Sequence, residues 1–308
     1  MEGINWNKIE DPIDKQVWEK LTSQFWIDTK IPVSNDLDSW RKMNEVEKEV
    51  VRKVFASLTL MDTLQGNVGA PTLQQFADTP HAEAVFANIA FMEHVHAKSY
   101  STIFSTLCST EDIDRLFRWA QDDDLLQEQV TAIEKRYVNH EPAVKFGACV
   151  LLESLLFYTG FYAPLRFASE GKLTNTADII RLIMRDEGVH GYYTGYKFQQ
   201  MNPSENAVTT IRNLATTLVH REVKRAEQLY DDIGWTEDVR KFIYYNANKA
   251  MSNLGLDPLF LAKDTKIPAY ILSSLDTTGE TFDFFSGAGS SYIIGETEET
   301  TEEDWSWD

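Results

Sequence analysis

The chain has 308 residues and a formal net charge of −19, from 48 acidic and 29 basic side chains. Such an acidic balance argues against nucleic acid or an anionic membrane surface as a partner, because both are negatively charged. The two cysteines, Cys108 and Cys149, lie in apolar surroundings without a Cys-x-x-Cys spacing, and residues 1–20 contain no apolar run. We therefore expect reduced thiols, no secretory signal and a cytoplasmic protein.

Helical periodicity runs through most of the chain, and turn signals separate the periodic segments. We expect helices over these ranges: Glu45–Leu64, His81–Leu107, Glu111–Val138, Val144–Arg166, Thr176–Gln200, Val208–Asp232 and Asp238–Leu254. The only β structure that the pattern allows is a short pairing near residues 270–295. The sequence predicts one all-α domain over residues 1–285, followed by a tail of residues 286–308.

Two of these helices carry a Glu-x-x-His unit. The first unit joins Glu93 to His96, and the second joins Glu187 to His190. A separation of three residues places both side chains on one face of a helix, where they can reach the same metal ion. One such unit arises often by chance on a solvated helix. Here both glutamates project from apolar faces, where an ionised carboxylate without a partner is too costly to bury.

Two further helices each present one carboxylate on an apolar face. Asp62 ends the apolar stripe of Glu45–Leu64, and Glu153 is the one charged residue of Phe146–Leu165. The six candidate metal ligands are Asp62, Glu93, His96, Glu153, Glu187 and His190. Four carboxylates and two neutral imidazoles carry a charge that two divalent cations cancel, and this donor set suits iron or manganese. The sequence thus predicts a ferritin-like di-metal-carboxylate helical bundle with extra helices.

The segment Phe146–Leu165 is also long and apolar enough to be considered as a membrane span. A glutamate at the centre of a bilayer costs roughly a few kcal/mol on insertion scales, and the segment also contains hydroxyl groups and Pro164. No second span is present in the sequence. We therefore expect a buried bundle helix and no membrane partner.

The tail of residues 286–308 has a different composition. It begins with a Gly- and Ser-rich stretch and ends in acidic residues with Trp305 and Trp307. Low hydrophobicity and high negative charge predict disorder in isolation, and a solubilising tail would explain the charges alone. Tryptophan is enriched in interaction hot spots, so we favour a docking peptide.

Several motifs together resemble those of one enzyme family. These motifs are Gln24-Phe25-Trp26, Ile31–Asp36, Met61–Gly66, Ala90–Ser101, Leu152–Ser154, Ile183–His190, Ser291-Tyr292 and the acidic aromatic C-terminus. They look like the small, radical-generating subunit of class I ribonucleotide reductases, most closely class Ib. An aspartate, Asp62, as the first ligand is the reductase pattern, whereas ferritins, desaturases and hydrocarbon monooxygenases use glutamate there.

The resemblance implies roles for residues outside the ligand set. Tyr100, one helical turn beyond His96, matches the tyrosine that is oxidised to a stable neutral radical. The pocket that keeps such a radical dry is matched by Phe157, Phe161 and Ile183, although ordinary core packing would also explain these three residues.

A second set of residues matches the family's route for electron transfer. The relay between the metal site and the surface is matched by Trp26, Asp186 and His96. In this relay Asp186 would form a hydrogen bond with the outer nitrogen of the His96 imidazole. Tyr292 matches the tyrosine that passes the radical to the large subunit.

The resemblance also implies an activity, a cofactor and partners. The activity is that of a ribonucleoside-diphosphate reductase, with two manganese or iron ions per chain and a tyrosyl radical on Tyr100. The partners are a second copy in a homodimer, the large subunit bound through the tail, and a flavodoxin-like activator that makes the oxidant. The class Ib resemblance favours manganese over iron.

Three rival functions use parts of the same pattern. A ferritin-like oxidase or storage protein would not need Trp26, Tyr292 or the tail. A reductase-like ferritin-superfamily di-metal oxidase would lack the docking peptide. A purely structural helical protein would bury four carboxylates without use.

Overall fold

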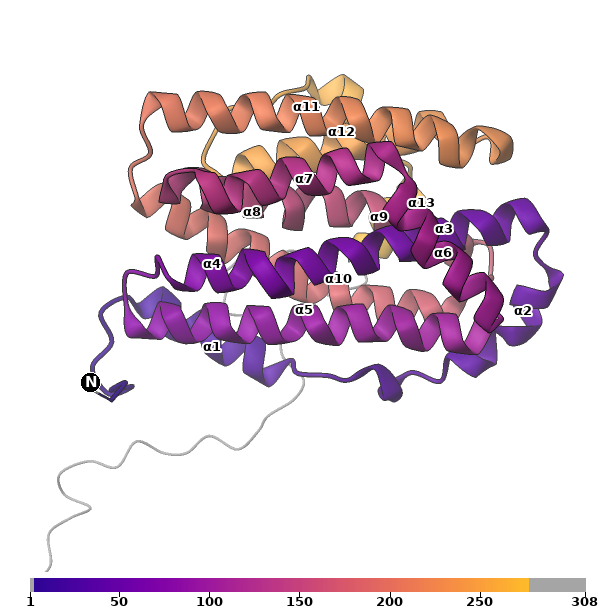
Figure 1. Ribbon diagram of the computed structural model, residues 1–308, viewed down its shortest axis with the longest axis horizontal. Helices are drawn as coiled ribbons and strands as arrows, with labels where there is room; N and C mark the ends of the chain where they lie inside the picture. Colours follow the sequence, from indigo (N-terminus) through magenta and orange to yellow (C-terminus); the bar gives the residue numbers. More distant parts are fainter. Residues whose placement is uncertain (1–2, 277–308) are drawn as a thin grey trace, which may run out of the picture.

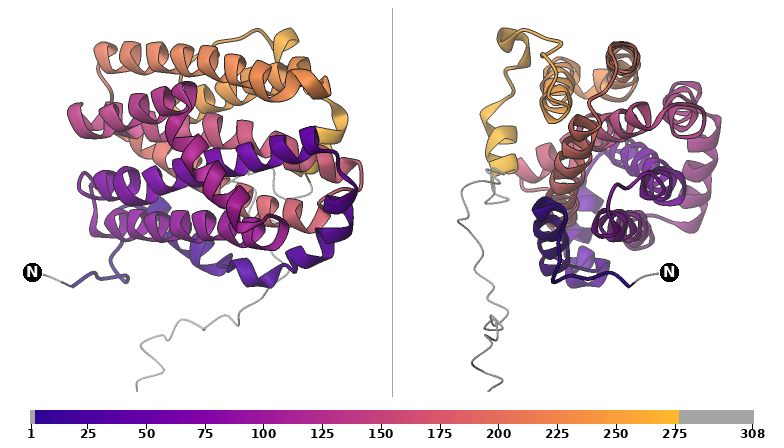
Figure 2. Two further views of the ribbon diagram at one scale, coloured as in Figure 1. Left: turned by 45° about the vertical axis from the view of Figure 1, so that its right-hand side comes forward. Right: turned by 90° about the vertical axis from the view of Figure 1, so that its left-hand side faces the viewer.

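The computed structural model describes residues 3–276, and this part of the chain is helical without any strand. The longest helices lie side by side along one direction (Figure 1), and the right-hand view of Figure 2 looks along them. The prediction of an all-α bundle is confirmed. Residues 269–276, where a β pairing was considered, form helix α13, and the rest of that segment lies outside the described residues.

Four helical units form the centre of the bundle. They are α3 (Glu45–Leu64), α5 (Pro80–Leu107), the continuous unit α8–η4–α9 (Pro142–Leu151, Leu152–Leu156 and Phe157–Ser169) and α10 (Thr174–Gln200). Helix α3 packs against α5 and α9, and α10 packs against α5, α8 and α9. Each of the four units contributes at least one of the six predicted ligands.

Shorter and outer helices surround this centre. They are α1 (Pro12–Ser23), α2 (Leu37–Lys42), α4 (Ala70–Gln74), α6 (Thr110–Asp122), α7 (Asp124–Asn139), α11 (Glu205–Tyr230), α12 (Thr236–Asn253) and α13 (Ala269–Asp276). Helices α11 and α12 pack on each other and on the α8–η4 side of the bundle, and α1 packs on α5 and α10. The outer helices thereby isolate the centre from solvent.

One predicted helix, Glu111–Val138, is two helices in the structure. The break falls at Asp123, whose backbone is extended with ψ 109° and whose side chain accepts a hydrogen bond from the N–H of Leu126. Aspartate is favoured at such a cap because its carboxylate satisfies a free N–H in the first turn of a helix. A cap therefore ends α6 and begins α7 within a pattern that is otherwise continuous.

Side-chain capping interactions lie at the starts of three of the four ligand-bearing units. Asn44 and Glu47 form a capping box at α3, and the Thr79 hydroxyl caps α5 ahead of Pro80. Helix α10 is capped from outside, because the Asp36 carboxylate accepts the backbone N–H and hydroxyl of Thr176, at 2.6 and 2.7 Å. These caps set where each helix begins and therefore the register of its ligands.

The apolar segment expected to be a bundle helix is buried. Among the described residues, Pro142–Ser169 is the one helix long and apolar enough to cross a membrane, and 94% of its apolar window is buried inside the protein. The buried apolar side chains of the described residues form one continuous core. The predicted domain boundary between residues 285 and 286 lies outside the described residues.

Candidate metal centre

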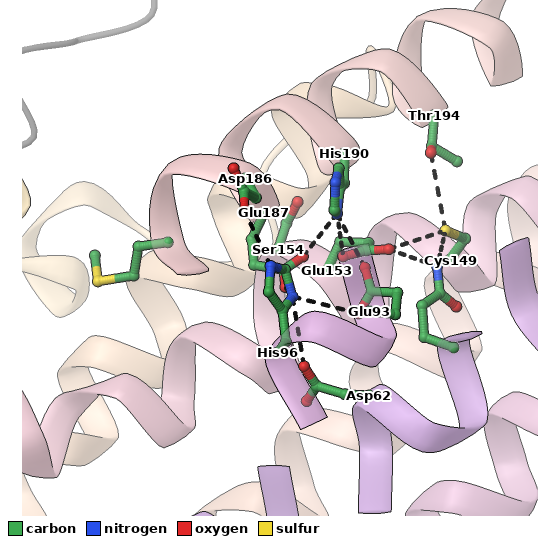
Figure 3. A network of polar contacts seen from close by, with 12 residues as sticks. Asp62, Glu93, His96, Cys149, Glu153, Ser154, Asp186, Glu187, His190 and Thr194 are labelled. Carbon is green, nitrogen blue, oxygen red and sulfur yellow. Dashed lines mark hydrogen bonds and ion pairs between the residues drawn. The ribbon is translucent and has the colours of Figure 1, made fainter. Parts of the chain in front are cut away.

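The six predicted ligands converge between the four central units (Figure 3). They form two groups in which the ligand atoms lie within 4.8 Å of one another. The Asp62 half-site consists of Asp62, Glu93, His96 and Glu187, and the Glu153 half-site consists of Glu93, Glu153, Glu187 and His190. Glu93 and Glu187 belong to both groups, which is the arrangement expected of carboxylates that bridge two metal ions.

Two π-helical turns adjoin the site. Glu153 lies in η4 (Leu152–Leu156), and η3 (Gln65–Gly69) begins three residues after Asp62. A π-helical turn changes the angular register of the residues that follow, and such turns occur often at functional sites. Asp62 therefore lies just before a local change of helical register, and Glu153 lies within one.

In the Asp62 half-site, the Nδ1 atom of His96 faces the carboxylates. It lies 2.9 Å from Glu187 Oε1, 3.6 Å from Asp62 Oδ1 and 3.7 Å from Glu93 Oε2. Its outer nitrogen, Nε2, lies 3.0 Å from Asp186 Oδ2. With Nδ1 free to bind a cation, Nε2 carries the proton, and this N–H donates a hydrogen bond to Asp186.

The Glu153 half-site is arranged in the same way around His190. Its Nδ1 lies 3.0 Å from Glu93 Oε1, 3.2 Å from Glu187 Oε2 and 3.7 Å from Glu153 Oε2. The outer nitrogen of His190 makes no hydrogen bond to any residue in 3–276. The two imidazole rings lie 6.0 Å apart between centroids and are inclined by 27° to each other.

The pKa values of the ligand side chains are shifted by burial and by their neighbours. Burial, followed by the charges of Glu93 and Glu187, raises the pKa of the Asp62 and Glu153 carboxyls well above its usual range. Burial opposes a charge on His96 and His190, but the surrounding carboxylates outweigh it and raise the pKa of both imidazoles. Without cations, the cluster is thus driven to hold protons.

The unsatisfied atoms test whether a metal pair fits this cluster. Buried atoms that make no hydrogen bond include both carboxylate oxygens of Asp62 and of Glu93, one each of Glu153 and Glu187, and His96 Nδ1. Buried polar atoms without partners are rare, because each costs about 1–3 kcal/mol. Lone pairs of oxygen and imidazole nitrogen directed at common points are the ligands of iron or manganese, so the residues present fit two such ions.

Tyr100 is buried next to this centre. Its side chain is 0% exposed, and its hydroxyl makes no hydrogen bond. Burial, followed by the charges of Asp62, Glu187 and Glu93, raises the pKa of the Tyr100 phenol well above its ordinary value. The phenol therefore stays protonated.

Tyr100 belongs to the apolar core of the bundle. The three predicted pocket residues, Phe157, Phe161 and Ile183, are each 0% exposed in the same core. Phe55 on α3 stacks on the Tyr100 ring at 5.7 Å and 25°. The sequence analysis did not connect Phe55 with Tyr100.

The predicted relay residues meet around Asp186. Trp26 Nε1 donates to Asp186 Oδ2 at 2.7 Å, and the Trp26 and His96 rings are nearly parallel at 5.9 Å. Gln24, which the sequence analysis quoted without a role, donates from Nε2 to Asp186 Oδ1 at 2.7 Å. It lies two residues before Trp26, directly after α1 ends at Ser23, and no spacing rule in the sequence marked it.

The sequence analysis missed one group of residues at the Glu153 half-site. Gln65, Tyr137 and Cys149 form buried polar contacts with Glu153 or with one another. Gln65 lies three residues after Asp62, on the same helical face, and that spacing was the signal that could have found it. Tyr292, Trp305 and Trp307 lie outside the described residues.

Comparison with known proteins gives consistent results. The model of the family described as "Ribonucleotide reductase, small chain" matches residues 3–268. The Escherichia coli protein named ribonucleoside-diphosphate reductase 2 subunit beta is 48% identical, over 99% of this chain and 98% of its own. A Mycobacterium leprae protein named ribonucleoside-diphosphate reductase subunit beta is 51% identical, over 98% of this chain and 95% of its own.

A solved structure is similar over the same region. The crystal structure of dimanganese(II)-NrdF from Streptococcus sanguinis superposes with a TM-score of 0.86 at 49% identity. It covers 89% of this chain and 99% of that chain. The similarity thus includes the whole helical bundle.

Proposed function

The chain belongs to the family of ribonucleotide reductase small chains, and we propose that its six buried ligands hold a dinuclear manganese or iron centre that serves a radical on Tyr100. The protein is the small subunit of a class Ib ribonucleoside-diphosphate reductase, a homodimer that works with a large subunit. The observation that carries the proposal is the paired ligand set with two shared glutamates beside a buried phenol. The dimanganese(II) centre named for the Streptococcus sanguinis protein favours manganese.

Each ligand has a place in this proposal. Asp62 and His96 would hold one ion, and Glu153 and His190 would hold the other, while Glu93 and Glu187 belong to both half-sites. When bound and oxidised, the metal pair supplies the oxidising power that removes one electron and one proton from a tyrosine. Asp62 and Glu153, whose carboxyl pKa values are raised, would in turn give up protons on metal binding.

Tyr100 is suited to lose an electron and a proton together. Its raised pKa keeps the phenol neutral, so loss of the electron alone would leave an unfavourable cation in the core. No neighbouring group donates a hydrogen bond to its oxygen, and the stacked ring of Phe55 helps to exclude water. The resulting neutral radical would be protected from reduction by solvent.

Electron transfer to the surface would use the contacts around Asp186. The Asp186 carboxylate accepts hydrogen bonds from both the His96 imidazole and the Trp26 indole, which gives a continuous path out of the centre. We assign Trp26 and Asp186 to this path and Tyr292 to its continuation toward the large subunit. Phe157, Phe161 and Ile183 are assigned to the wall of the radical pocket.

The remaining assignments concern organisation and partners. Residues 1–285 form one domain, and residues 286–308 dock on the large subunit through Trp305 and Trp307. A flavodoxin-like protein supplies the oxidant for the manganese form. Both cysteines are free thiols, which supports a reducing compartment such as the cytoplasm.

The central experiment is reconstitution of the apoprotein with Mn²⁺ or Fe²⁺ and the matching oxidant. We expect two ions per chain, an EPR signal near the free-electron g value, and reduction of ribonucleoside diphosphates when the large subunit is added. Tyr100→Phe should keep both ions and the fold but lose the signal and the activity. Full activity in Tyr100→Phe would contradict the assignment of the radical.

The docking role of the tail has a separate test. Deletion of residues 296–308 leaves the ligands and Tyr100 in place, so the radical yield should be normal. Binding to the large subunit should weaken by about tenfold or more. The reason is that two tryptophans buried on docking contribute roughly 25 cal/mol per Å² of apolar area before ordering costs. Trp305→Ala with Trp307→Ala should reproduce most of this loss. If the truncated protein supports full reduction at low subunit concentration, the tail has no docking role.

A further inference from the structure

Gln65 is a fully buried glutamine at the first position of the π-helical turn η3. Its side-chain amide lies between a phenol and a candidate metal ligand. Oε1 accepts a hydrogen bond from the Tyr137 hydroxyl at 2.7 Å, and Nε2 donates to Glu153 Oε1 at 2.5 Å. Tyr137 is itself fully buried, so this chain of hydrogen bonds lies inside the protein.

The direction of these hydrogen bonds follows from chemistry. If the Gln65 amide were turned over, its oxygen would face Glu153 Oε1, and two acceptors would meet without a proton between them. An ionised Glu153, which metal binding requires, therefore needs Nε2 on its side. The Tyr137 hydroxyl favours the same orientation of the amide. In this orientation Gln65 Oε1 faces Tyr137 and accepts the hydrogen bond of its hydroxyl.

The backbone leaves space for this amide at one position. A Cβ atom added to Gly69 would lie 1.9 Å from Gln65 Oε1 and 3.0 Å from Tyr137 Cε2. Real Cβ atoms do not approach oxygen so closely, so only glycine is compatible with the observed side chain of Gln65. The glycine at the end of η3 therefore keeps open the space that the amide occupies.

The contact also connects the two irregular turns of the site. Gln65 begins η3 and Glu153 lies in η4, so their hydrogen bond joins the two π-helical turns across the bundle. The other carboxylate oxygen, Glu153 Oε2, makes no hydrogen bond and lies 3.7 Å from His190 Nδ1. One oxygen is thus occupied by the amide, and the other is left for a cation.

We propose that Gln65, oriented by Tyr137 and given space by Gly69, is a positioning residue that holds Glu153 as a one-oxygen ligand of the Glu153 half-site. This inference rests on the proposed metal centre and extends it. The amide fixes the rotation of the carboxylate before a metal ion arrives, so less conformational freedom is lost on binding. Partners of this kind typically change metal affinity by about 10- to 100-fold.

The test is a titration of apoprotein with Mn²⁺ alone, followed by calorimetry and by the EPR signal of unbound Mn²⁺. Gln65→Leu keeps a similar volume but removes the amide. We expect one of the two ions to bind about 10- to 100-fold more weakly, with the other unchanged. The readout needs neither the radical nor the large subunit. Wild-type protein that binds fewer than two ions would instead contradict the proposed metal centre.

The chain offers a matched control for the loss of a buried glutamine. Gln129 on α7 is also fully buried and donates to Glu222 Oε1 at 2.7 Å, in a cluster that contains no candidate metal ligand. Gln129→Leu should lower the melting temperature but leave both Mn²⁺ affinities as in the wild type. A Gln65→Leu protein with wild-type affinities, or with both sites weakened equally, would overturn the proposal.

A second variant keeps the test decisive if Gln65→Leu does not fold. Tyr137→Phe removes one oxygen atom and leaves the glutamine in place, so its amide is free to turn over. It should weaken the same ion by a smaller factor and leave the other ion unaffected. Unchanged affinity for both ions in a folded Tyr137→Phe protein would show that the phenol does not orient Gln65, and would overturn its part in the proposal.

Discussion

The two half-sites share two glutamates but are supported in opposite ways. In the Asp62 half-site, the imidazole is held from outside, because His96 donates to Asp186, while the oxygens of Asp62 make no hydrogen bond. In the Glu153 half-site, the carboxylate is held by Gln65, while the outer nitrogen of His190 makes no hydrogen bond. One half-site fixes its nitrogen ligand, and the other fixes its terminal oxygen ligand.

This difference separates two tasks. The support of His96 continues through Asp186 to Trp26, so the Asp62 half-site has a polar connection leading away from the centre. The support of Glu153 ends at the buried phenol of Tyr137. We infer that the first half-site is built for electron transfer and the second for holding its carboxylate in one position.

The largest effect should come from removing a ligand that both half-sites share. Glu187→Ala takes one oxygen donor from each ion, so we expect affinity to fall by more than about 100-fold at both and activity to be lost. Glu153→Ala removes a ligand of one half-site and should leave one ion bound per chain. Metal analysis after gel filtration distinguishes the two variants. Equal metal contents would contradict the assignment of Glu187 as a shared ligand.

A smaller and selective effect is expected from Asp186→Asn. The Asp186 carboxylate accepts hydrogen bonds from Gln24, Trp26 and His96, whereas an amide offers one acceptor oxygen and turns two N–H donors toward the remaining partners. The Asp62 half-site should lose about 10- to 100-fold in affinity for Mn²⁺, and the Glu153 half-site should not change. The result is the reverse of that expected for Gln65→Leu. Loss at both half-sites would mean that the two supports are not independent.

The sequence predicted those parts of the centre that depend on local spacing. Glu93 with His96, and Glu187 with His190, are three residues apart, so helical geometry alone places each pair on one face. Helix α3 begins and ends at the predicted residues, Glu45 and Leu64. A capping box marks its start.

The supports of the centre could not be predicted in the same way. Gln65 and Glu153 are 88 residues apart, and Asp36 caps α10 from 140 residues away. Such contacts depend on how helices pack, which no local pattern determines. The π-helical turn around Glu153 was also not expected, because its residues have the same apolar character as their helical neighbours. The predicted roles of Trp26 and Asp186 came from family resemblance and not from periodicity.

A moderate effect is expected when pH and metal content are varied together. In the apoprotein, the folded-state pKa values of Asp62, Glu153, His96 and His190 are raised, so the stability that their protons contribute is present at low pH and lost as pH rises through those values. The lowered pKa of Glu187 acts in the opposite direction, but only in stronger acid. Apoprotein should therefore melt higher as pH is lowered from about 8 to about 6.

The metal-bound protein should respond to pH with the opposite sign. Its ligands are deprotonated, so protons compete with the ions and the melting temperature should fall as pH is lowered over the same range. Calorimetric scans of both forms measure the two slopes, with each kcal/mol shifting the melting temperature by about 2–4 °C. Parallel slopes would show that the ligand protons do not control stability.

The smallest effect is expected at the thiol beside the Glu153 half-site. Cys149 Sγ lies 3.0 Å from Gln65 Nε2 and 3.6 Å from Glu153 Oε1, and burial raises the pKa of the thiol, which therefore remains neutral. A sulfur atom is a weak acceptor, so Gln65 Nε2 should remain directed mainly at the carboxylate. Cys149→Ser keeps a polar atom at the same place but leaves a slightly larger space. We expect a loss of about 1 kcal/mol or less in stability.

Metal binding by Cys149→Ser decides which neighbour supports Glu153. If the amide of Gln65 is the support, the variant should bind both Mn²⁺ ions with affinities close to the wild type, because the hydrogen bond to Glu153 Oε1 is retained. Mn²⁺ titration and thermal unfolding of the same sample measure both quantities. If Cys149→Ser instead weakened the Glu153 half-site as much as Gln65→Leu does, the thiol would share the support of Glu153, and the half-site would be held by two neighbours instead of one.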